Sequence, residues 1–447
     1  MNDKNVVNLE TQERDSFSNK FGFILACVGS AVGMGNIWLF PYRVGQFGGF
    51  AFLIPYWIWV ILLGFSGVIG EMSFGRAMQS GPLGACKKAM ERRGKKNGDL
   101  IGLIPVIGSL GIGIGYAVVV GWIIRFLVGS ITGAMISAPD SGAYFGEIAG
   151  PFGSVPWHLI ALILTFIIMN AGISEGIEKV NKVMMPLFFI LFLILAVRVA
   201  FLPDAQSGYQ FMFNADWSAL KNPRAWIYAL GQAFFSLSLA GSGTVVYGSY
   251  LKNDIDVINS AKYIAVFDTI AAMIASLVIL PAVFAFRMDP GAGPPLMFIT
   301  MPEIFKQMPG GSLFATIFFV AVFFAGITSL INLFETPIEA LQSRFNFSRL
   351  KAVATIAVIA IGVGIFIESG DTIGVWMDLV SIYIIPLGAI VAAVMFYWVC
   401  GKGFPTEQIQ LGREKTVWPW IEPLGKYVFC GVSIFVYIIG ILLGGIG

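Results

Sequence analysis

The stretch Gly29-Ser30-Ala31-Val32-Gly33-Met34-Gly35-Asn36 interrupts an apolar run, with apolar residues at 21–28 before it and at 37–40 after it. A second interrupted run, Ser236-Leu237-Ser238-Leu239-Ala240-Gly241-Ser242-Gly243, lies midway along the chain. Glycine and serine in mid-span free backbone N–H and C=O groups from the helical ladder, and hydrocarbon cannot satisfy those groups. Two broken spans in matching places therefore predict a pair of discontinuous helices that line a transport site.

The composition is that of an integral membrane protein. Of the 447 residues, 57% are hydrophobic and only 12% are charged, and the mean hydropathy is +0.81. Soluble domains average about 25% charged residues. We therefore expect the lipid bilayer, and no nucleic acid, as the macromolecular surroundings of the chain.

The apolar runs account for about eleven membrane spans of roughly 20 residues each. We place them at 19–45, 50–78, 100–131, 155–171, 182–202, 225–250, 261–287, 312–341, 350–368, 374–400 and 425–446. The loop after the second span is rich in Lys and Arg, whereas the loop at 132–154 has neither. Because cytoplasmic loops carry the excess of positive charge, this alternation predicts a cytoplasmic N-terminus and, with an odd span count, an extracellular C-terminus.

Spans one to five and spans six to ten form two halves that each begin with a broken helix. An odd number of spans per half gives the halves opposite orientations, so the expected fold is an all-α polytopic membrane protein with a five-plus-five inverted repeat. Its expected parts are a cytoplasmic segment at 1–18, the repeats at 19–202 and 225–400, an extracellular loop at 203–224, and a cytoplasmic loop with the eleventh span at 401–447.

Ionisable side chains fall inside several predicted spans, and each should face the bundle interior or a cavity. They are Arg43, Glu71, Asp268, Glu335 and Asp378. A carboxylate among them either closes a helix contact as a buried polar group or meets a cation, a proton or a basic partner. Asp268 is the most informative, because no Lys or Arg lies near it in the apolar run 263–280.

Sodium is a candidate partner of Asp268, because the two breaks and the segment 325–329 offer carbonyl and hydroxyl oxygens. The alternative for Thr328 and Ser329 is back-bonding to the preceding helical turn. The only histidine, His158, begins a span beside Trp157, and we expect it at the membrane interface rather than as a catalytic base. No nucleophile–base pair is visible, so an enzyme is not expected.

The stretch 29–42 closely resembles the first-span signature of the neurotransmitter:sodium symporter family. The resemblance continues, in order, through 48–49, 71–76, 176–186, 232–239 and 324–329, and it spans the chain from about Arg14 to about residue 400. It is strongest to the bacterial amino-acid transporters of that family. What it implies is a sodium-coupled symporter located in the inner (plasma) membrane of a bacterial cell.

The resemblance implies two sodium sites, each built from broken-span oxygens. The first site would be completed by the substrate carboxylate, and its protein ligands would be the Ala31 carbonyl with Asn36, Ser236 and Asp268. The second site would use carbonyls and two hydroxyls, from Gly29, Val32, Ala325, Thr328 and Ser329.

The resemblance also implies a substrate site between the breaks, with the substrate carboxylate at Gly33, Gly35 and the Tyr116 hydroxyl, and with Phe235 as a lid. A leucine-transporting member of the family has a bulky aromatic residue where Gly241 stands, so the pocket here should admit aromatic as well as aliphatic side chains. The expected substrate residues are Ala31, Gly33, Met34, Gly35, Trp38, Ile112, Tyr116, Phe235, Ser236, Ser238, Gly241, Ser329 and Leu333.

The gates depart from the family pattern. The family usually has arginine at the position of Leu39, paired with an acid that matches Asp378, and we hypothesise that Arg43, one helical turn away, substitutes for it. Arg14 matches the inner-gate arginine, but the usual acid partner aligns with Ser343.

The segment between Gly176 and Pro186 matches a family segment that can unwind and admit water, although a harmless proline kink is the simpler reading. Ala272 stands where other members bind chloride, so we expect chloride-independent transport in which Asp268, assisted by Glu71, supplies the negative charge.

The sequence thus predicts a sodium symporter for hydrophobic L-amino acids. The alternatives are a transporter of another amine or osmolyte and a substrate sensor or channel on the same fold.

Overall fold

The computed structural model describes residues 15–214, 216–239, 242–289 and 296–446. Within these ranges the regular secondary structure is helical and no strand is present. Arg14 and Gly241, expected above to act in a gate and in the substrate pocket, lie outside the described ranges.

The first span is broken where the glycine-rich stretch predicts. Helix α1 (Lys20–Ala31) begins with the Asn19 side chain accepting from the Gly22 N–H at 2.9 Å, and it ends at Val32, whose backbone is extended. The chain resumes as a π-helical turn, Gly35–Leu39, followed by α2 (Phe40–Gln46). The two parts are bent by 54° relative to each other, so the first discontinuous helix is confirmed.

The rest of the first half consists of long helices with short ones at the ends of the bundle. The long ones are α3 (Phe50–Leu63) with α4 (Ile69–Met78), α6 (Gly98–Thr132), α9 (Val155–Asn170) and α10 (Lys179–Ala200). The short ones are α5 (Pro82–Glu91), α7 (Ala134–Ser137), α8 (Ser141–Ile148) and α11 (Ala205–Phe213).

The second half begins with α12 (Pro223–Ser236) and α13 (Gly243–Ser249), which flank the second predicted break. Its long helices are α14 (Val257–Ala285), α16 (Gly311–Phe345), α17 (Arg349–Gly364), α18 (Gly370–Asp378) with α19 (Ile385–Val394), and α22 (Cys430–Leu443). Its short helices are α15 (Met301–Gln307), α20 (Phe404–Gln410) and α21 (Ile421–Pro423).

Eight of the described helical stretches are long and apolar enough to cross a membrane, and the bent first pair raises this number to nine. The other two predicted spans correspond to α9, a shorter apolar helix, and to the pair α12 and α13. The fifth span begins earlier than predicted, because the π-helical turn Ile173–Glu178 continues directly into α10.

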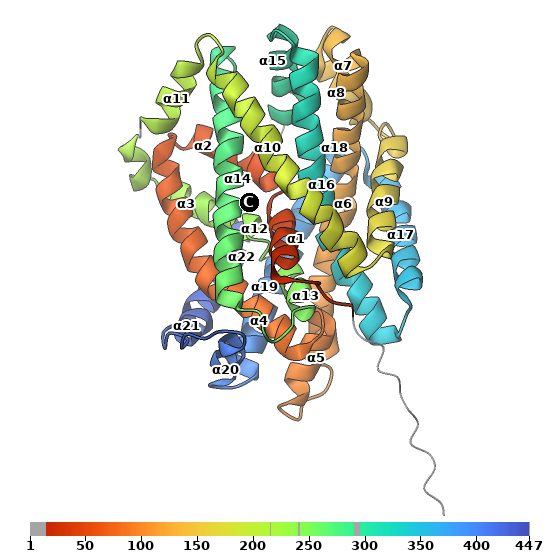
Figure 1. Cartoon of the computed structure of the whole chain (residues 1–447), viewed down its shortest axis with the longest axis vertical. Coiled ribbons are helices and arrows are strands. Elements are labelled where there is room, and N and C mark those ends of the chain that lie inside the picture. The colour runs from red at the N-terminus through yellow and green to blue at the C-terminus, as the bar shows by residue number, and fades with distance from the viewer. Residues whose placement is uncertain (1–14, 215, 240–241, 290–295, 447) are drawn as a thin grey trace, which may run out of the picture.

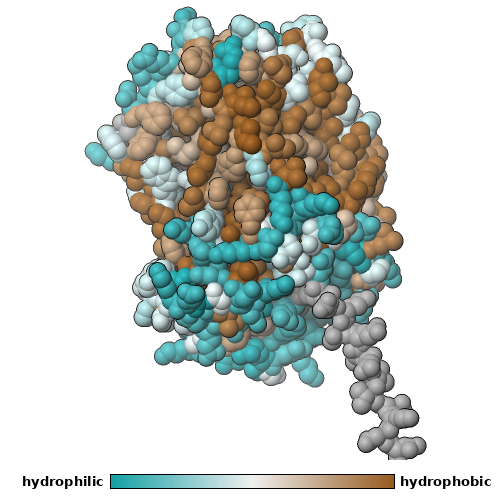
Figure 2. Space-filling view, viewed as in Figure 1, coloured by the Kyte–Doolittle hydropathy of each residue, from teal (hydrophilic) through white to brown (hydrophobic). Residues whose placement is uncertain are grey.

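The face of the molecule in Figure 2 carries an apolar band between two more polar ends. Helices α4, α5, α20 and α21 gather at one end, and α7, α8, α11 and α15 gather at the other (Figure 1). Exposed apolar side chains on α10 illustrate the band: Val183, Leu187, Ile190, Leu193, Ile194 and Val197. Apolar side chains facing outward around a helical bundle are what a lipid-facing surface requires.

Small residues bring the central helices close together. α6 and α16 pack against each other, and α6 also packs against α9. A Cβ atom on Gly121 of α6 would lie 2.7 Å from the backbone nitrogen of His158 on α9, so only glycine permits this approach.

Candidate functional site

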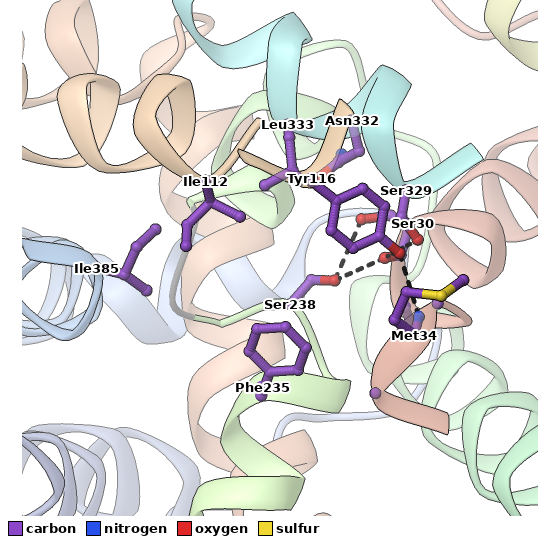
Figure 3. Close-up of a pocket in the computed structure, with 13 residues that line it drawn as sticks. Ser30, Met34, Ile112, Tyr116, Phe235, Ser238, Ser329, Asn332, Leu333 and Ile385 are labelled. Atoms are coloured by element: carbon purple, nitrogen blue, oxygen red, sulfur yellow. Dashed lines mark hydrogen bonds between the residues drawn. The ribbon is translucent and has the colours of Figure 1, made fainter. Parts of the chain in front are cut away.

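A cavity lies between the two breaks (Figure 3). Its walls come from α1, the two breaks, α6, α12, α16 and α19. The lining residues are Ser30, Ala31, Gly33, Met34, Gly35, Ile112, Tyr116, Phe235, Ser238, Ser329, Asn332, Leu333 and Ile385. The lining thus combines backbone and hydroxyl groups with apolar side chains.

Ten of the thirteen predicted substrate residues line this cavity, and two further described residues do not. Trp38 lines a second, larger cavity next to it, and Ser236 lies among the residues around Asp268. Gly241 is outside the described residues. The individual roles of the lining residues remain predictions.

Side chains satisfy the backbone groups that the first break releases. The Tyr116 hydroxyl accepts from the Met34 N–H at 3.1 Å, and the Gln232 side-chain amide donates to the Gly35 carbonyl at 2.9 Å. The Met34 N–H would otherwise be unpaired and carry a desolvation penalty, whereas the Gly35 carbonyl also accepts from the Phe40 N–H within the π-helical turn.

The two breaks also contact each other directly. The Ser238 hydroxyl donates to the Ser30 carbonyl at 3.0 Å, and the Ser30 hydroxyl lies 3.2 Å from Ser238 Oγ (Figure 3). Ser30 was not among the predicted site residues, although it stands inside the quoted glycine-rich stretch.

Asp268 is fully buried on α14 and accepts hydrogen bonds from both breaks. The Asn36 side-chain amide donates to Asp268 Oδ1 at 2.7 Å, and the Ser236 hydroxyl lies 2.8 Å from both carboxylate oxygens. The Tyr56 hydroxyl lies 3.4 Å from Oδ2. No ion pair involving Asp268 is present among the described residues. A buried carboxylate with only neutral neighbours suits a bound cation.

The residues predicted for the second sodium site meet where α1 packs against α16. Ser329 Oγ lies 3.2 Å from the carbonyl oxygens of both Gly29 and Val32. Thr328 Oγ1 lies 3.2 Å from the Ala325 carbonyl oxygen and 2.9 Å from that of Phe324. The back-bond of Thr328 to Phe324 is the alternative noted from sequence, and it coexists with the clustering of these oxygens.

The larger second cavity adjoins the first and shares Phe235 with it. Arg43 and Asp378 both line this second cavity. The Arg43 guanidinium lies 4.0 Å from the Tyr228 ring centroid and donates to Gln46 Oε1 at 2.9 Å. The ion pairs among the described side chains do not join Arg43 to Asp378, so their predicted pairing remains a hypothesis.

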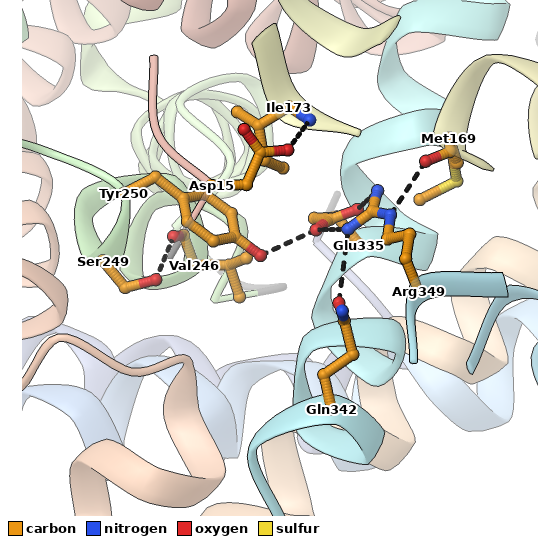
Figure 4. Close-up of polar contacts among 9 residues, drawn as sticks. All are labelled: Asp15, Met169, Ile173, Val246, Ser249, Tyr250, Glu335, Gln342 and Arg349. Atoms are coloured by element: carbon orange, nitrogen blue, oxygen red, sulfur yellow. Dashed lines mark hydrogen bonds and ion pairs between the residues drawn. The ribbon is translucent and has the colours of Figure 1, made fainter. Parts of the chain in front are cut away.

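On the side of the site toward α4 and α5, a polar cluster closes the bundle (Figure 4). Glu335, fully buried on α16, pairs with both terminal nitrogens of Arg349 at 2.6 and 2.7 Å. The Tyr250 hydroxyl donates to Glu335 at 2.7 Å, and Arg349 Nε donates to the Met169 carbonyl at 2.8 Å. Arg349 follows a turn after α16, so nothing in the local pattern around Glu335 identified it as the partner.

The segment between Gly176 and Pro186 is helical here and is held by the chain just before α1. The Ser18 backbone N–H donates to Glu178 Oε2 at 2.7 Å, and the Ser18 hydroxyl also contacts this carboxylate. Lys182 pairs with Glu178 at 2.6 Å. Any unwinding of this segment must therefore break or carry along these contacts.

The expectation that His158 lies at the membrane interface is wrong. The side chain is fully buried, not interfacial, and its Nδ1 lies 2.9 Å from Glu368 Oε1. The burial follows from close helix approach, since a Cβ atom on Gly364 of α17 would lie 2.3 Å from His158 Cε1.

Comparison with known proteins identifies one family of sodium symporters that matches nearly the whole chain. The model of the sodium:neurotransmitter symporter family matches residues 14–139 and 146–442. The structure resembles a crystal structure of MhsT in complex with L-phenylalanine, with a TM-score of 0.84, 33% identity and coverage of 95% of this chain and 99% of that one.

Two sequence relatives are sodium-dependent transporters. YhdH of Bacillus subtilis is 35% identical over 360 residues, which is 80% of this chain and 79% of the relative. A transporter of Haemophilus influenzae is 32% identical over 352 residues, which is 76% and 77% of the two chains. The chain therefore belongs to the sodium:neurotransmitter symporter family and is a sodium-coupled, multi-pass membrane transporter.

Proposed function

We propose that this transporter couples inward sodium flow to the uptake of hydrophobic L-amino acids, aromatic ones included, without a need for chloride. The observation that carries the proposal is the position of Asp268. This buried carboxylate is joined through Asn36 and Ser236 to both breaks, beside the central cavity. A sodium ion there would neutralise the carboxylate and attract the carboxylate of a substrate in the cavity.

The chemistry of the cavity supports an amino acid as substrate. The backbone at Gly33 and Gly35 and the Tyr116 hydroxyl give the cavity polar groups, which suit the charged groups that all amino acids share. Ile112, Leu333 and Ile385 add an apolar lining, which suits an apolar side chain. MhsT, whose structure contains L-phenylalanine, has the same fold.

Two sodium sites are proposed, with the ligands predicted from sequence. The first comprises Ala31, Asn36, Ser236 and Asp268, and the second comprises Gly29, Val32, Ala325, Thr328 and Ser329. The Ser236 hydroxyl beside the Asp268 carboxylate supports the first site, and the Ser329 hydroxyl beside the carbonyls of Gly29 and Val32 supports the second. Unwound carbonyls and hydroxyls are the ligands that such transporters use for sodium.

The proposed cycle uses the two cavities and the polar cluster in turn. Substrate enters through the larger cavity, which shares Phe235 with the site, and sodium holds the broken helices in the receptive form. Opening of the Glu335 cluster and unwinding between Gly176 and Pro186 then release the second sodium ion on the other side. From the basic loops we infer that this side faces the cytoplasm of a bacterial cell, and that the protein resides in its plasma membrane.

Purified protein in proteoliposomes tests the proposal. An inward sodium gradient should drive accumulation of labelled L-phenylalanine above equilibrium, with competition by leucine and tryptophan, and replacing chloride with gluconate should leave the rate unchanged. Equilibration without accumulation would indicate a channel. Competition by betaine but by no amino acid would indicate an osmolyte transporter, and loss of uptake in gluconate would contradict chloride independence.

A further inference from the structure

The side chain of Asn181 presents an unused oxygen to the region of the second sodium site. Asn181 lies on α10 and is fully buried. Its Nδ2 donates to the Ile177 carbonyl at 2.8 Å, whereas its Oδ1 has no hydrogen-bond partner among the described residues. Because a backbone carbonyl only accepts, this bond orients the amide with its oxygen turned away from Ile177.

That oxygen rests against α1 beside the predicted ligands. A Cβ atom built on Gly29 would lie 1.9 Å from Asn181 Oδ1 and 3.0 Å from Thr328 Cβ. The oxygen thus occupies the space that a side chain on Gly29 would need, next to the helix that carries Thr328. Gly29 also supplies one of the carbonyls that Ser329 contacts at 3.2 Å.

We propose that Asn181 is a sodium-positioning residue that links occupancy of the second sodium site to the winding of the start of α10. The proposal rests on the two-site function given above. Burying a carbonyl oxygen without a partner is costly, and a nearby sodium ion, directly or through one water, removes that cost. Sodium takes neutral oxygen ligands of this kind in broken-helix transporters.

The same side chain depends on the helix being wound. Asn181 lies between Gly176 and Pro186, and its amide bonds to the carbonyl of Ile177, inside the π-helical turn Ile173–Glu178. Unwinding separates these two groups and withdraws the oxygen from α1. By reciprocity, sodium that prefers the wound form must stabilise that form to the same extent.

The test uses the purified full-length chain without substrate, and compares hydrogen exchange of the backbone amides at 176–186 in sodium and in potassium. In the wild type, sodium should slow exchange in this segment. Asn181→Leu keeps the bulk but removes the oxygen, so the sodium concentration for half-maximal protection should rise about tenfold, which is about 1.4 kcal/mol. If this variant is not recovered as a monodisperse protein, Asn181→Ala takes its place with the same expectation.

Asn181→Asp retains the oxygen and adds charge, so its half-maximal sodium concentration should equal or fall below that of the wild type. Ser433→Ala is the control, because Ser433 on α22 is also buried without a hydrogen-bond partner in the described structure. L-phenylalanine binding at saturating sodium should change by less than about twofold in Asn181→Leu.

The role of Asn181 would be overturned if Asn181→Leu kept the wild-type sodium concentration for half-maximal protection. It would also be overturned if that concentration rose equally in Asn181→Leu and Asn181→Asp. Either result would leave the proposed function intact. If neither phenylalanine binding nor amide exchange of the wild-type protein depended on sodium, both the role of Asn181 and the proposed function would be overturned.

Discussion

The hydroxyl of Tyr116 accepts a hydrogen bond from the backbone N–H of Met34, at 3.1 Å. Tyr116 belongs to α6, which is continuous, whereas Met34 lies in the break of the first span. The bond fixes the discontinuous helix to a rigid neighbour at the edge of the cavity. In the proposed function, the same hydroxyl donates its proton to the substrate carboxylate.

Tyr116→Phe should therefore weaken substrate binding more than it weakens the fold. The variant leaves the Met34 N–H unpaired and removes a donor to the carboxylate, a loss of about 1–3 kcal/mol. L-phenylalanine affinity at saturating sodium should fall by about tenfold or more. Tyr144→Phe, a tyrosine outside the cavity, is the control. Unchanged affinity in Tyr116→Phe would contradict a contact with substrate.

Asp268→Asn should raise the sodium concentration needed for half-maximal uptake by about tenfold or more, because an isosteric neutral group removes the charge that attracts the ion. The measurement is sodium-dependent uptake of labelled L-phenylalanine in proteoliposomes. Ser276→Ala, on the same helix, is buried and without a partner among the described residues, and it should leave the sodium dependence unchanged. A normal sodium dependence in Asp268→Asn would remove Asp268 from the first site.

Gly241→Phe should reduce tryptophan uptake far more than leucine uptake. Gly241 is outside the described residues, so this expectation rests on the sequence comparison. A ring at this position would take up the room that a larger substrate side chain needs, and one added group in a pocket discriminates by about 1–3 kcal/mol. Competition by the two amino acids against labelled L-phenylalanine measures the ratio. Equal losses would argue against a steric role, and Gly241→Ala should change the ratio little.

Arg43 and Asp378 should behave as an interacting pair in the larger second cavity, which both of them line. Arg43→Asp and Asp378→Arg are each expected to slow uptake by like-charge repulsion, and the double exchange is expected to restore part of the rate. The contrary outcome is that the double exchange leaves uptake slow while Tyr228→Leu alone slows uptake as much as Arg43→Asp does. In that case Arg43 acts through its contact with the Tyr228 ring, whose centroid lies 4.0 Å from the guanidinium, and not through Asp378.

Glu335→Gln should destabilise the protein by about 3–5 kcal/mol, because it leaves the Arg349 guanidinium without its charge partner in a mostly buried place. Replacing both residues with apolar side chains, Glu335→Leu with Arg349→Met, should recover much of the loss. Thermal unfolding in detergent measures the difference. Glu91→Gln removes an exposed pair with Lys87 and should cost about 0–1 kcal/mol. Equal losses of stability in Glu335→Gln and Glu91→Gln would contradict the importance of burial.

Local sequence was sufficient for the class of fold and for much of the cavity. Hydrocarbon tolerates only satisfied backbone, so long apolar runs predict helices, and glycine-rich interruptions such as 29–36 predict where a helix breaks. The residues of a break are neighbours in the chain and stay neighbours in space, which is why Gly33, Met34 and Gly35 all line the same cavity. The family resemblance supplied the residues on other helices.

Partners that come from distant helices could not be found in the same way. Arg349 meets Glu335 across a turn, and Glu368 meets His158 across two helices. Asn332 and Ile385 line the cavity although neither lies in a recognised motif. On lipid-facing helices apolar residues occur all round, so periodicity does not reveal which face packs inward or which polar group it will meet.

The sequence by itself therefore determined that this chain crosses the membrane many times, where its first helix breaks, and to which family it belongs. Only the tertiary structure decided which side chains meet Glu335 and His158, and that Ser30 and Asn332 also line the cavity. The physical reason is that a break follows from backbone groups that hydrocarbon cannot satisfy, which is a local property. A binding site depends on helix packing, which brings together residues that the chain keeps far apart.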